Sequence, residues 1–189
     1  MSDAIFFIGP QGSGKGTQAR LLAERLGFFY WEMGGISREL TREDSPLGRR
    51  AKELNDQGIL FPDDMIFEMV RSRLSQIPAG QGIVFDGIPR RLNQAHFLLD
   101  LLRSLGRTSF LTIHLPIPQE ESLKRLLLRA EIEKRVDDTR EKIERRLEQY
   151  AEETLPVVEY LRAATKFVEI DGQPPIPEVT KEINAALTV

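Results

Sequence analysis

The segment GPQGSGKGTQ, residues 9–18, constrains the fold more than any other part of the sequence. It lies between the apolar run AIFFI and the helix-like run ARLLAERLG. A strand, a glycine-rich turn and a helix in this order place backbone N–H groups and a helix N-terminus around one point, which suits an anion. Gly9, Gly14 and Lys15 fit the pattern GxxxxGK, in which the lysine reaches the β and γ phosphates of a nucleoside triphosphate. The segment therefore predicts a phosphate-binding loop.

The loop departs from the general pattern at one position. That pattern has Ser or Thr directly after the lysine, whereas this chain has Gly16 and then Thr17. The variant GKGT is typical of a narrower group of kinases.

Composition excludes several classes of function. The 189 residues, 41% of them hydrophobic, suffice for one domain core. A net charge of -3 provides no overall positive field for nucleic acid or anionic lipid, so we expect neither as a partner. The absence of cysteine excludes disulfides and thiolate metal sites, and leaves His96 and His114 as the imidazoles. The N-terminus has no signal-peptide pattern, so we expect a cytoplasmic protein.

Short apolar runs of strand type alternate with segments of helical period, which indicates an α/β fold with a parallel sheet flanked by helices. An aromatic run bounded by glycines suggests a fifth strand. The expected strands are residues 4–9, 28–31, 82–87, 110–115 and 166–170.

Three helices follow from capping and stop signals. Ser45 and Pro46 suit the start of a helix that ends near Gly58, and a second helix runs from 62 to about 73; neither has obvious sheet contact. The segment 138–163 predicts one long helix, opened by Asp138 and Glu141 in a capping box.

The segment FDGIPRR, residues 85–91, is the second candidate site. The carboxyl ends of parallel strands face the ligand crevice, so Asp86 would lie beside the phosphate loop and orient Mg²⁺ through water. Arg90 would then meet a second phosphate. The alternative is a loop aspartate paired with a neighbouring arginine.

Residues 124–146 concentrate basic side chains in a chain that is acidic overall. Arg125 and Arg129 are four apart, so on a helix they would repel each other unless an anion lies between them. Interspersed acidic residues allow another interpretation, a salt-bridged solvent face. Phosphoryl transfer between two phosphate chains favours the first, because it requires positioned arginines and magnesium.

Six segments together resemble the adenylate kinase family of nucleoside monophosphate kinases: GPQGSGKGTQ, SPLGRRAKELNDQGILFPDD, FDGIPRRLNQA, RLLLR, RVDDTREKIERRLEQY and FVEIDG. The resemblance implies one domain, residues 1–189, of P-loop type: a five-stranded parallel sheet with helices on both faces, an AMP-binding helical insert at 32–60 and a short lid at 125–136. A lid this short has no room for the zinc site of longer relatives. Relatives of the short form are commonly monomers.

The resemblance also implies a role for individual residues in the reversible conversion of ATP and AMP to two ADP, without a general base. The residues implied for ATP are Gly12, Ser13, Gly14, Lys15, Gly16, Thr17, Arg125, which packs on the base, and Arg129. Those implied for AMP are Met33, Arg38, Gly87, Arg90, Gln94, Arg135 and Arg146. The catalytic set is Lys15, Arg90, Arg129, Arg135 and Arg146, with Asp86 for Mg²⁺.

The acceptor side departs from the family pattern. The family usually has Ser-Thr-Gly-Asp where this chain has Glu32, Met33, Gly34 and Gly35. Met33 offers no strong hydrogen bond to a base, and Gly35 removes a charge and frees the backbone. Two alternatives therefore stay open beside an adenylate kinase: a monophosphate kinase shifted toward CMP, UMP or a deoxynucleotide, and a catalytically weak nucleotide-binding sensor.

Overall fold

The computed structural model describes residues 3–133 and 139–187. Within this part of the chain, five parallel strands form one sheet in the order β2-β3-β1-β4-β5. The strands are β1 (Ala4–Ile8), β2 (Phe29–Glu32), β3 (Ile83–Asp86), β4 (Phe110–His114) and β5 (Lys166–Glu169). All five expected strands are confirmed, and the aromatic one is shifted by a single residue. Because all strands run in one direction, their carboxyl ends lie at the same edge of the sheet.

The connections between the strands are helical, as a parallel sheet requires. The helices are α1 (Lys15–Leu26), α2 (Met33–Leu40), α3 (Pro46–Asp56), α4 (Asp63–Leu74), α5 (Leu92–Ser104), α6 (Gln119–Glu133), α7 (Arg140–Gln149), α8 (Leu155–Ala164) and α9 (Ile176–Leu187), and a π-helical turn, η1 (Tyr150–Thr154), joins α7 to α8.

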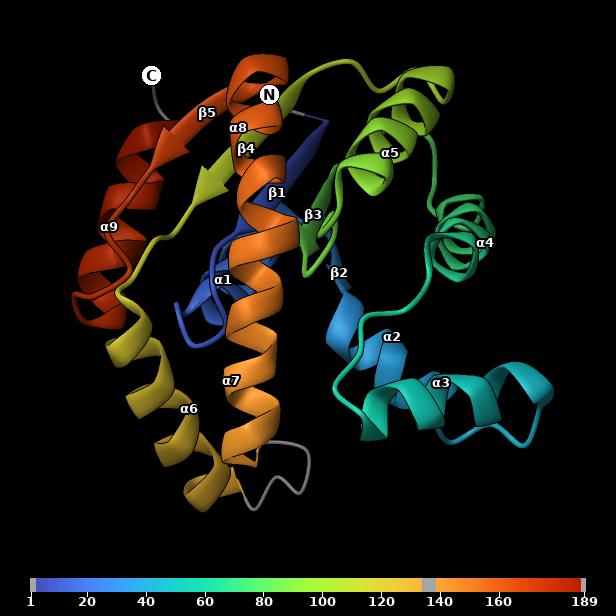
Figure 1. Cartoon of the computed structure of the whole chain (residues 1–189). Helices are drawn as coiled ribbons and strands as arrows, with labels where there is room; N and C mark the ends of the chain where they lie inside the picture. The colour runs from blue at the N-terminus through green and yellow to red at the C-terminus, as the bar shows by residue number, and fades with distance from the viewer. Residues whose placement is uncertain (1–2, 134–138, 188–189) are drawn as a thin grey trace.

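Helices cover both faces of the sheet. Phe6 and alternate residues of its neighbouring strands pack against α4, α5 and α8, while Phe7 and the opposite face pack against α1 and α9. Figure 1 shows α5 and α8 on the viewer's side. Trp31 is fully buried among the first group. The doubly covered sheet explains why the strand segments are continuous apolar runs.

Two helix pairs extend away from the sheet. The pair α2 and α3 projects to one side and the pair α6 and α7 to the other (Figure 1). Ser45 caps α3 as expected, its hydroxyl accepting a hydrogen bond from the Gly48 N–H at 2.9 Å, and Pro46 is the first helical residue. α4 begins at Asp63 and packs on α5, which agrees with the expectation that it has no obvious contact with the sheet, and Met65 and Val70 of this helix belong to the core.

The expected single helix over 138–163 is wrong in two details. It begins at Arg140 with Thr139 as its N-cap, and Asp138, the expected cap, lies outside the described residues. It is also interrupted by η1, which ends two residues before Pro156. A proline inside a helix removes one N–H donor and clashes with the carbonyl four residues earlier, and the wider π turn accommodates this.

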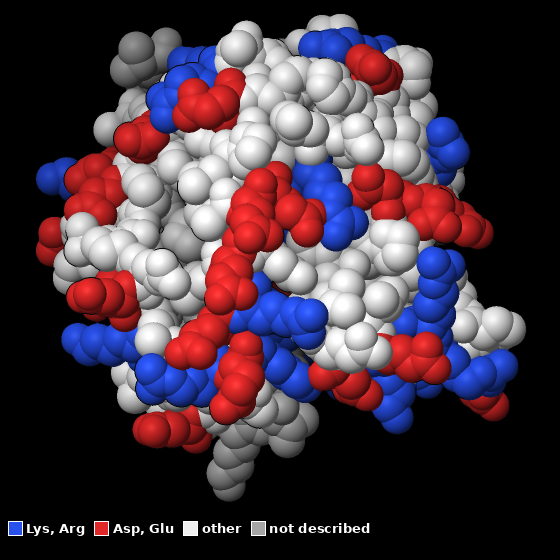
Figure 2. All heavy atoms as spheres, viewed as in Figure 1, with Lys and Arg blue, Asp and Glu red and all other residues white. Residues whose placement is uncertain are grey.

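The surface is mixed in charge. Figure 2 shows acidic and basic side chains interspersed on the face that carries α7. No helix in the described residues has the length and apolarity needed to cross a membrane.

Truncation of Phe6 tests this core. Its ring stacks on Phe85 with centroids 5.2 Å apart and meets the edge of Phe110 at 6.2 Å. We expect Phe6→Ala to lower the free energy of unfolding by about 3–5 kcal/mol, because it leaves a cavity in a fully buried site. Urea unfolding followed by circular dichroism measures the loss. Phe67→Ala is the control: Phe67 stacks on Phe97 but is only partly buried, so its loss should be less than half as large, and equal losses would contradict this core.

Candidate active site

A cavity of about 810 Å³ lies where the carboxyl ends of the strands meet the two projecting helix pairs. It is lined by segments that are far apart in the sequence, from the phosphate loop to α7. Most residues expected in the site line it: Gly12, Gly14, Lys15, Gly16, Thr17, Met33, Arg38, Asp86, Gly87, Arg90, Gln94, Arg129 and Arg146.

The glycine-rich loop connects β1 directly to α1, as expected. Gly14 is the residue before the helix and has φ 86°, a left-handed conformation that favours glycine. The turn leaves Lys15 as the first residue of α1, with its ammonium donating a hydrogen bond to the Pro10 carbonyl at 3.2 Å. The lysine thus bends back over the loop, and the first three residues of α1 line the cavity.

Lys15 has an unusual pKa. Its pKa is lowered to about 8, chiefly by desolvation; Asp86 acts in the opposite direction, and Arg90 and Arg129 add to the lowering. These influences show that one carboxylate and two guanidinium groups lie near the ammonium. Such a cluster of cations favours a polyanion over a single charge.

Asp86 explains why glycine follows the lysine. A Cβ atom at Gly16 would lie 3.0 Å from Asp86 Oδ2, closer than ordinary contact allows. The same Oδ2 lies 3.2 Å from the hydroxyl of Tyr30, which also lies 3.4 Å from the Gly16 carbonyl. Burial raises the pKa of Tyr30, and the Asp86 charge raises it further, so the phenol stays protonated and can donate to the carboxylate. The Gly16 variant therefore makes room for the carboxylate at the end of β3.

Arg90 is fixed by the loop that carries it. Its side-chain Nε donates to the Gly87 carbonyl at 2.9 Å, and its backbone N–H donates to Gln94 Oε1 at 2.9 Å. The Thr154 hydroxyl donates to the backbone carbonyl of Arg90 at 3.0 Å. Burial lowers the pKa of Arg90; Asp86 raises it and Arg146 lowers it. Thr154 belongs to η1, so the π turn supports the arginine loop directly.

Gln94 is buried, and its side-chain amide lines the cavity. Its oxygen accepts from Arg90, and its nitrogen donates to Asp63 Oδ1 at 2.9 Å. A carboxamide has a second N–H and a second lone pair, which keeps one donor and one acceptor for a ligand.

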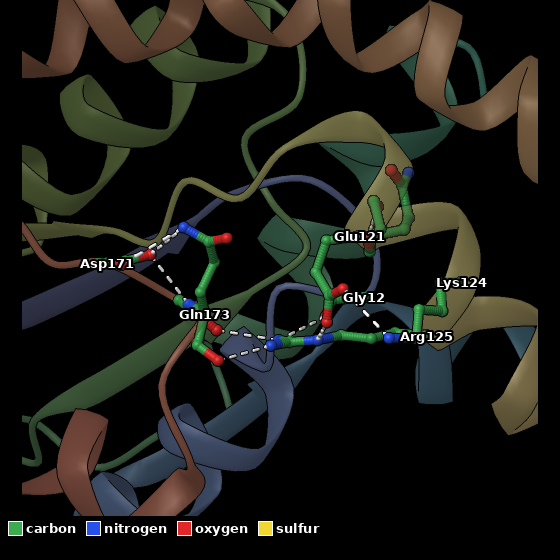
Figure 3. Close-up of polar contacts among 9 residues, drawn as sticks. Gly12, Glu121, Lys124, Arg125, Asp171 and Gln173 are labelled. Atoms are coloured by element: carbon green, nitrogen blue, oxygen red, sulfur yellow. Dashed lines mark hydrogen bonds and ion pairs between the residues drawn. The ribbon is translucent and has the colours of Figure 1, made fainter.

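Arg125 differs from expectation. It does not line the cavity. Its guanidinium donates to Glu121 Oε1 at 2.7 Å and to the carbonyls of Gly172 and Gln173 at 2.9 and 2.8 Å, and Nη1 lies 3.4 Å from the Gly12 carbonyl. Figure 3 shows the Arg125 side chain extending toward Gly12 and Gln173, with the Glu121 carboxylate beside it. Glu121 and these carbonyls satisfy the Arg125 guanidinium within the protein, and the Glu121 carboxylate is the anion that it contacts.

Of the other expected residues, one lies outside the cavity lining and one outside the described part of the chain. Ser13 is buried beneath the loop, and its side chain does not line the cavity. Arg135 lies outside the described residues.

Sequence reasoning missed Tyr30 and Asp63, which hold Asp86 and Gln94. Tyr30 stood within an aromatic run interpreted only as a strand. Strand alternation was the available signal: Tyr30 and Glu32 share the face opposite Trp31, and a charged residue on that face at a strand end indicates a polar site. Asp63 carried no signal beyond its place in the first turn of α4.

The residues fit magnesium that arrives with phosphates. Mg²⁺ prefers oxygen ligands, keeps several waters and is usually held by one or two carboxylates plus phosphate oxygens. Asp86 supplies one such carboxylate at the edge of the cavity. In the described parts of the chain, no three His, Cys, Asp or Glu side chains form a metal-binding group.

Comparison with known proteins identifies the family. The family model described as "Adenylate kinase" matches residues 7–166. The chain belongs to the adenylate kinase family. An adenylate kinase of Thermus thermophilus is 40% identical over 189 residues, covering 100% of this chain and 99% of the relative. Adenylate kinase 1 of a Nostoc species is 39% identical over 183 residues, covering 97% of both chains. Membership of this adenylate kinase family makes the chain a kinase, a phosphotransferase with a phosphate group as acceptor.

The pKa of Lys15 predicts how phosphate binding depends on pH. An anion binds the protonated lysine better, so affinity for tripolyphosphate should be highest below pH 8 and should fall by up to about tenfold per pH unit above it. Calorimetric titration between pH 6.5 and 9.5 measures the slope. Lys15→Arg is the control, because arginine stays charged throughout and the anion's own titration is common to both proteins. Equal slopes would show that Lys15 does not carry the effect.

Proposed function

We propose that the chain transfers the terminal phosphoryl group of ATP to AMP, reversibly, giving two ADP. The observation that carries this is the joining of two anion-binding elements in one cavity. The phosphate loop with Lys15 lines one part of it, and Arg38 and Arg90 line another. A protein that only bound ATP would have no need of Arg38 and Arg90 in addition to the phosphate loop.

On the donor side, Lys15 and the loop amides of Gly12–Thr17 would hold the β and γ phosphates. Arg125 would take the donor base on the plane of its guanidinium. The N–H groups at the edge of this guanidinium donate to the carbonyls of Gly172 and Gln173. A base that stacks on the guanidinium contacts its flat face, so these hydrogen bonds can stay in place.

On the acceptor side, Arg38 and Arg90 would bind the AMP phosphate, beside Gly87. Gln94 would use its remaining donor and acceptor on the adenine, a pairing that suits the edge of this base. Met33, buried at the start of α2 and lining the cavity, would contact the purine through its thioether.

The reaction breaks the bond from the γ phosphorus to the bridging oxygen of ATP and forms one to a phosphate oxygen of AMP. The acceptor is already an anion, so no general base is needed, and catalysis depends on positioning and charge neutralisation. Arg129, Arg135 and Arg146 would surround the transferred group. Magnesium, when bound with the phosphates, would supply further charge neutralisation, and Asp86 would hold it through water.

Two parts of the chain would move on binding. We assign the acceptor-binding insert to residues 32–60 and the lid to residues 125–136, both within a single domain of 189 residues. Their closure would exclude water from the phosphoryl group. A cytoplasmic monomer without structural zinc remains our expectation from the family resemblance.

A coupled assay of ADP formation tests the proposal. With ATP and Mg²⁺ we expect turnover with AMP to exceed that with CMP, UMP, GMP and dAMP. Lys15→Met should lower kcat by orders of magnitude, because it removes the charge nearest the transferred phosphates. A preference for another monophosphate would favour the shifted kinase, and ATP binding without turnover on any monophosphate would favour the sensor.

Met33→Thr tests the acceptor base contact. If a hydroxyl at this position bonds the base, the KM for AMP should fall several-fold, by about 0.5–1.5 kcal/mol of binding free energy, with the KM for ATP unchanged. Steady-state kinetics with each substrate varied in turn measures both. Met33→Leu, similar in volume and without a polar atom, is the matched control; an unchanged KM for AMP in Met33→Thr would show that the thioether is neutral.

A further inference from the structure

Two adjacent glycines stand near the start of α2, although glycine destabilises a helix relative to alanine. Gly34 and Gly35 are both helical, so neither is needed for a left-handed conformation. The reason lies in what covers them. A Cβ atom at Gly35 would lie 3.3 Å from Glu32 Oε2 and 3.4 Å from Glu32 Cδ. One at Gly34 would lie 3.2 Å from Arg38 Nη1.

The groups above the two glycines form an ion pair. Arg38 Nη2 donates to Glu32 Oε1 at 2.7 Å. Arg38 is four residues after Gly34, so its long side chain folds back along the helix over the bare glycine surface. The glycine pair thus provides a flat surface on which the carboxylate and the guanidinium lie side by side.

Glu32 has the position of a helix cap but does not act as one. It is the N-cap residue of α2, and its side chain makes no capping hydrogen bond. The carboxylate instead contacts Arg38 and lies 3.9 Å from Arg20 Nη2 on α1. Glu32, Arg20 and Arg38 all line the cavity. The carboxylate therefore links the core to the acceptor-side helix through two arginines.

We propose that Glu32 is a positioning residue that holds Arg38 in place for the acceptor phosphate, and that it replaces the carboxylate usual in the family at position 35. This rests on the proposed function. A guanidinium has five N–H donors, so Arg38 can keep its bond to Glu32 through one and offer others to a phosphate. A side chain at position 35 and the Glu32 carboxylate compete for the same space, which is why the carboxylate at 32 occurs with glycine at 35.

The opposite effect is also physically available, because a carboxylate beside the phosphate site repels the ligand. The side chains of Glu32 and Arg38 are 32% and 42% exposed, so water screens both the attraction and the repulsion. The two effects change the KM for AMP in opposite directions, which makes the proposal decidable.

The test is a cycle of Glu32→Ser, Gly35→Asp and the double variant, with steady-state kinetics and calorimetric AMP binding on the full chain. Glu32→Ser should raise the KM and Kd for AMP about fivefold with the KM for ATP unchanged. Gly35→Asp should also weaken AMP binding, because two carboxylates then crowd one space. The double variant should return to within about twofold of the native protein. Glu32→Gln, which keeps an oxygen for Arg38, should fall between the native protein and Glu32→Ser.

Glu39→Ser is the matched control. It removes a carboxylate from the same helix, paired with Arg73 at 3.6 Å outside the cavity lining, and should leave the KM for AMP unchanged. Thermal unfolding shows that each variant is folded. A lower or unchanged KM for AMP in Glu32→Ser, or additive losses in the double variant, would overturn the role of Glu32. A native protein that turns over no monophosphate and binds no AMP would instead overturn the proposed function, and the role of Glu32 with it.

Discussion

The fold keeps several cations close together around a cavity, before any phosphate is present to neutralise them. Lys15, Arg38, Arg90, Arg129 and Arg146 all line one cavity, and burial lowers the pKa of Lys15 and Arg90. Like charges that share one cavity repel each other, so each cation must be held in place by a polar group of the protein. Lys15 donates to the Pro10 carbonyl, Arg90 to the Gly87 carbonyl and Arg38 to the Glu32 carboxylate. Fixed oxygens of the protein thus occupy these cations in a site suited to phosphate oxygens.

The parallel sheet is what brings these groups together. β3 pairs with β1, so the Asp86 end of β3 lies next to the strand that enters the phosphate loop. β2 pairs with β3, and this places Glu32 and the start of α2 at the same edge. Strand order therefore brings the charged residues of three separate loops close together. Asp86 offsets part of the positive charge on Lys15 and Arg90.

The sequence predicted the features that local rules decide. The strands were predictable from apolar runs, the phosphate loop from its glycine spacing, and the start of α3 from Ser45 and Pro46. The features it missed depend on distant partners. The satisfaction of Arg125 needs carbonyls 47 and 48 residues away. The sequence showed Pro156 inside a helical pattern, but it did not show whether the helix would end there or continue through a π turn.

The glycines at positions 16 and 35 show why the departures from motif were difficult to interpret. A glycine in a sequence suggests a turn or a free backbone, and the latter was expected at Gly35. Both residues are helical, and both lie under a carboxylate: that of Asp86, from β3, at Gly16, and that of Glu32, three residues earlier in the chain, at Gly35. Each glycine therefore matters because its missing side chain leaves space for a carboxylate. The space can be interpreted only when the carboxylate that fills it is known. At this edge of the sheet, each glycine must therefore be considered together with the carboxylate for which it makes room.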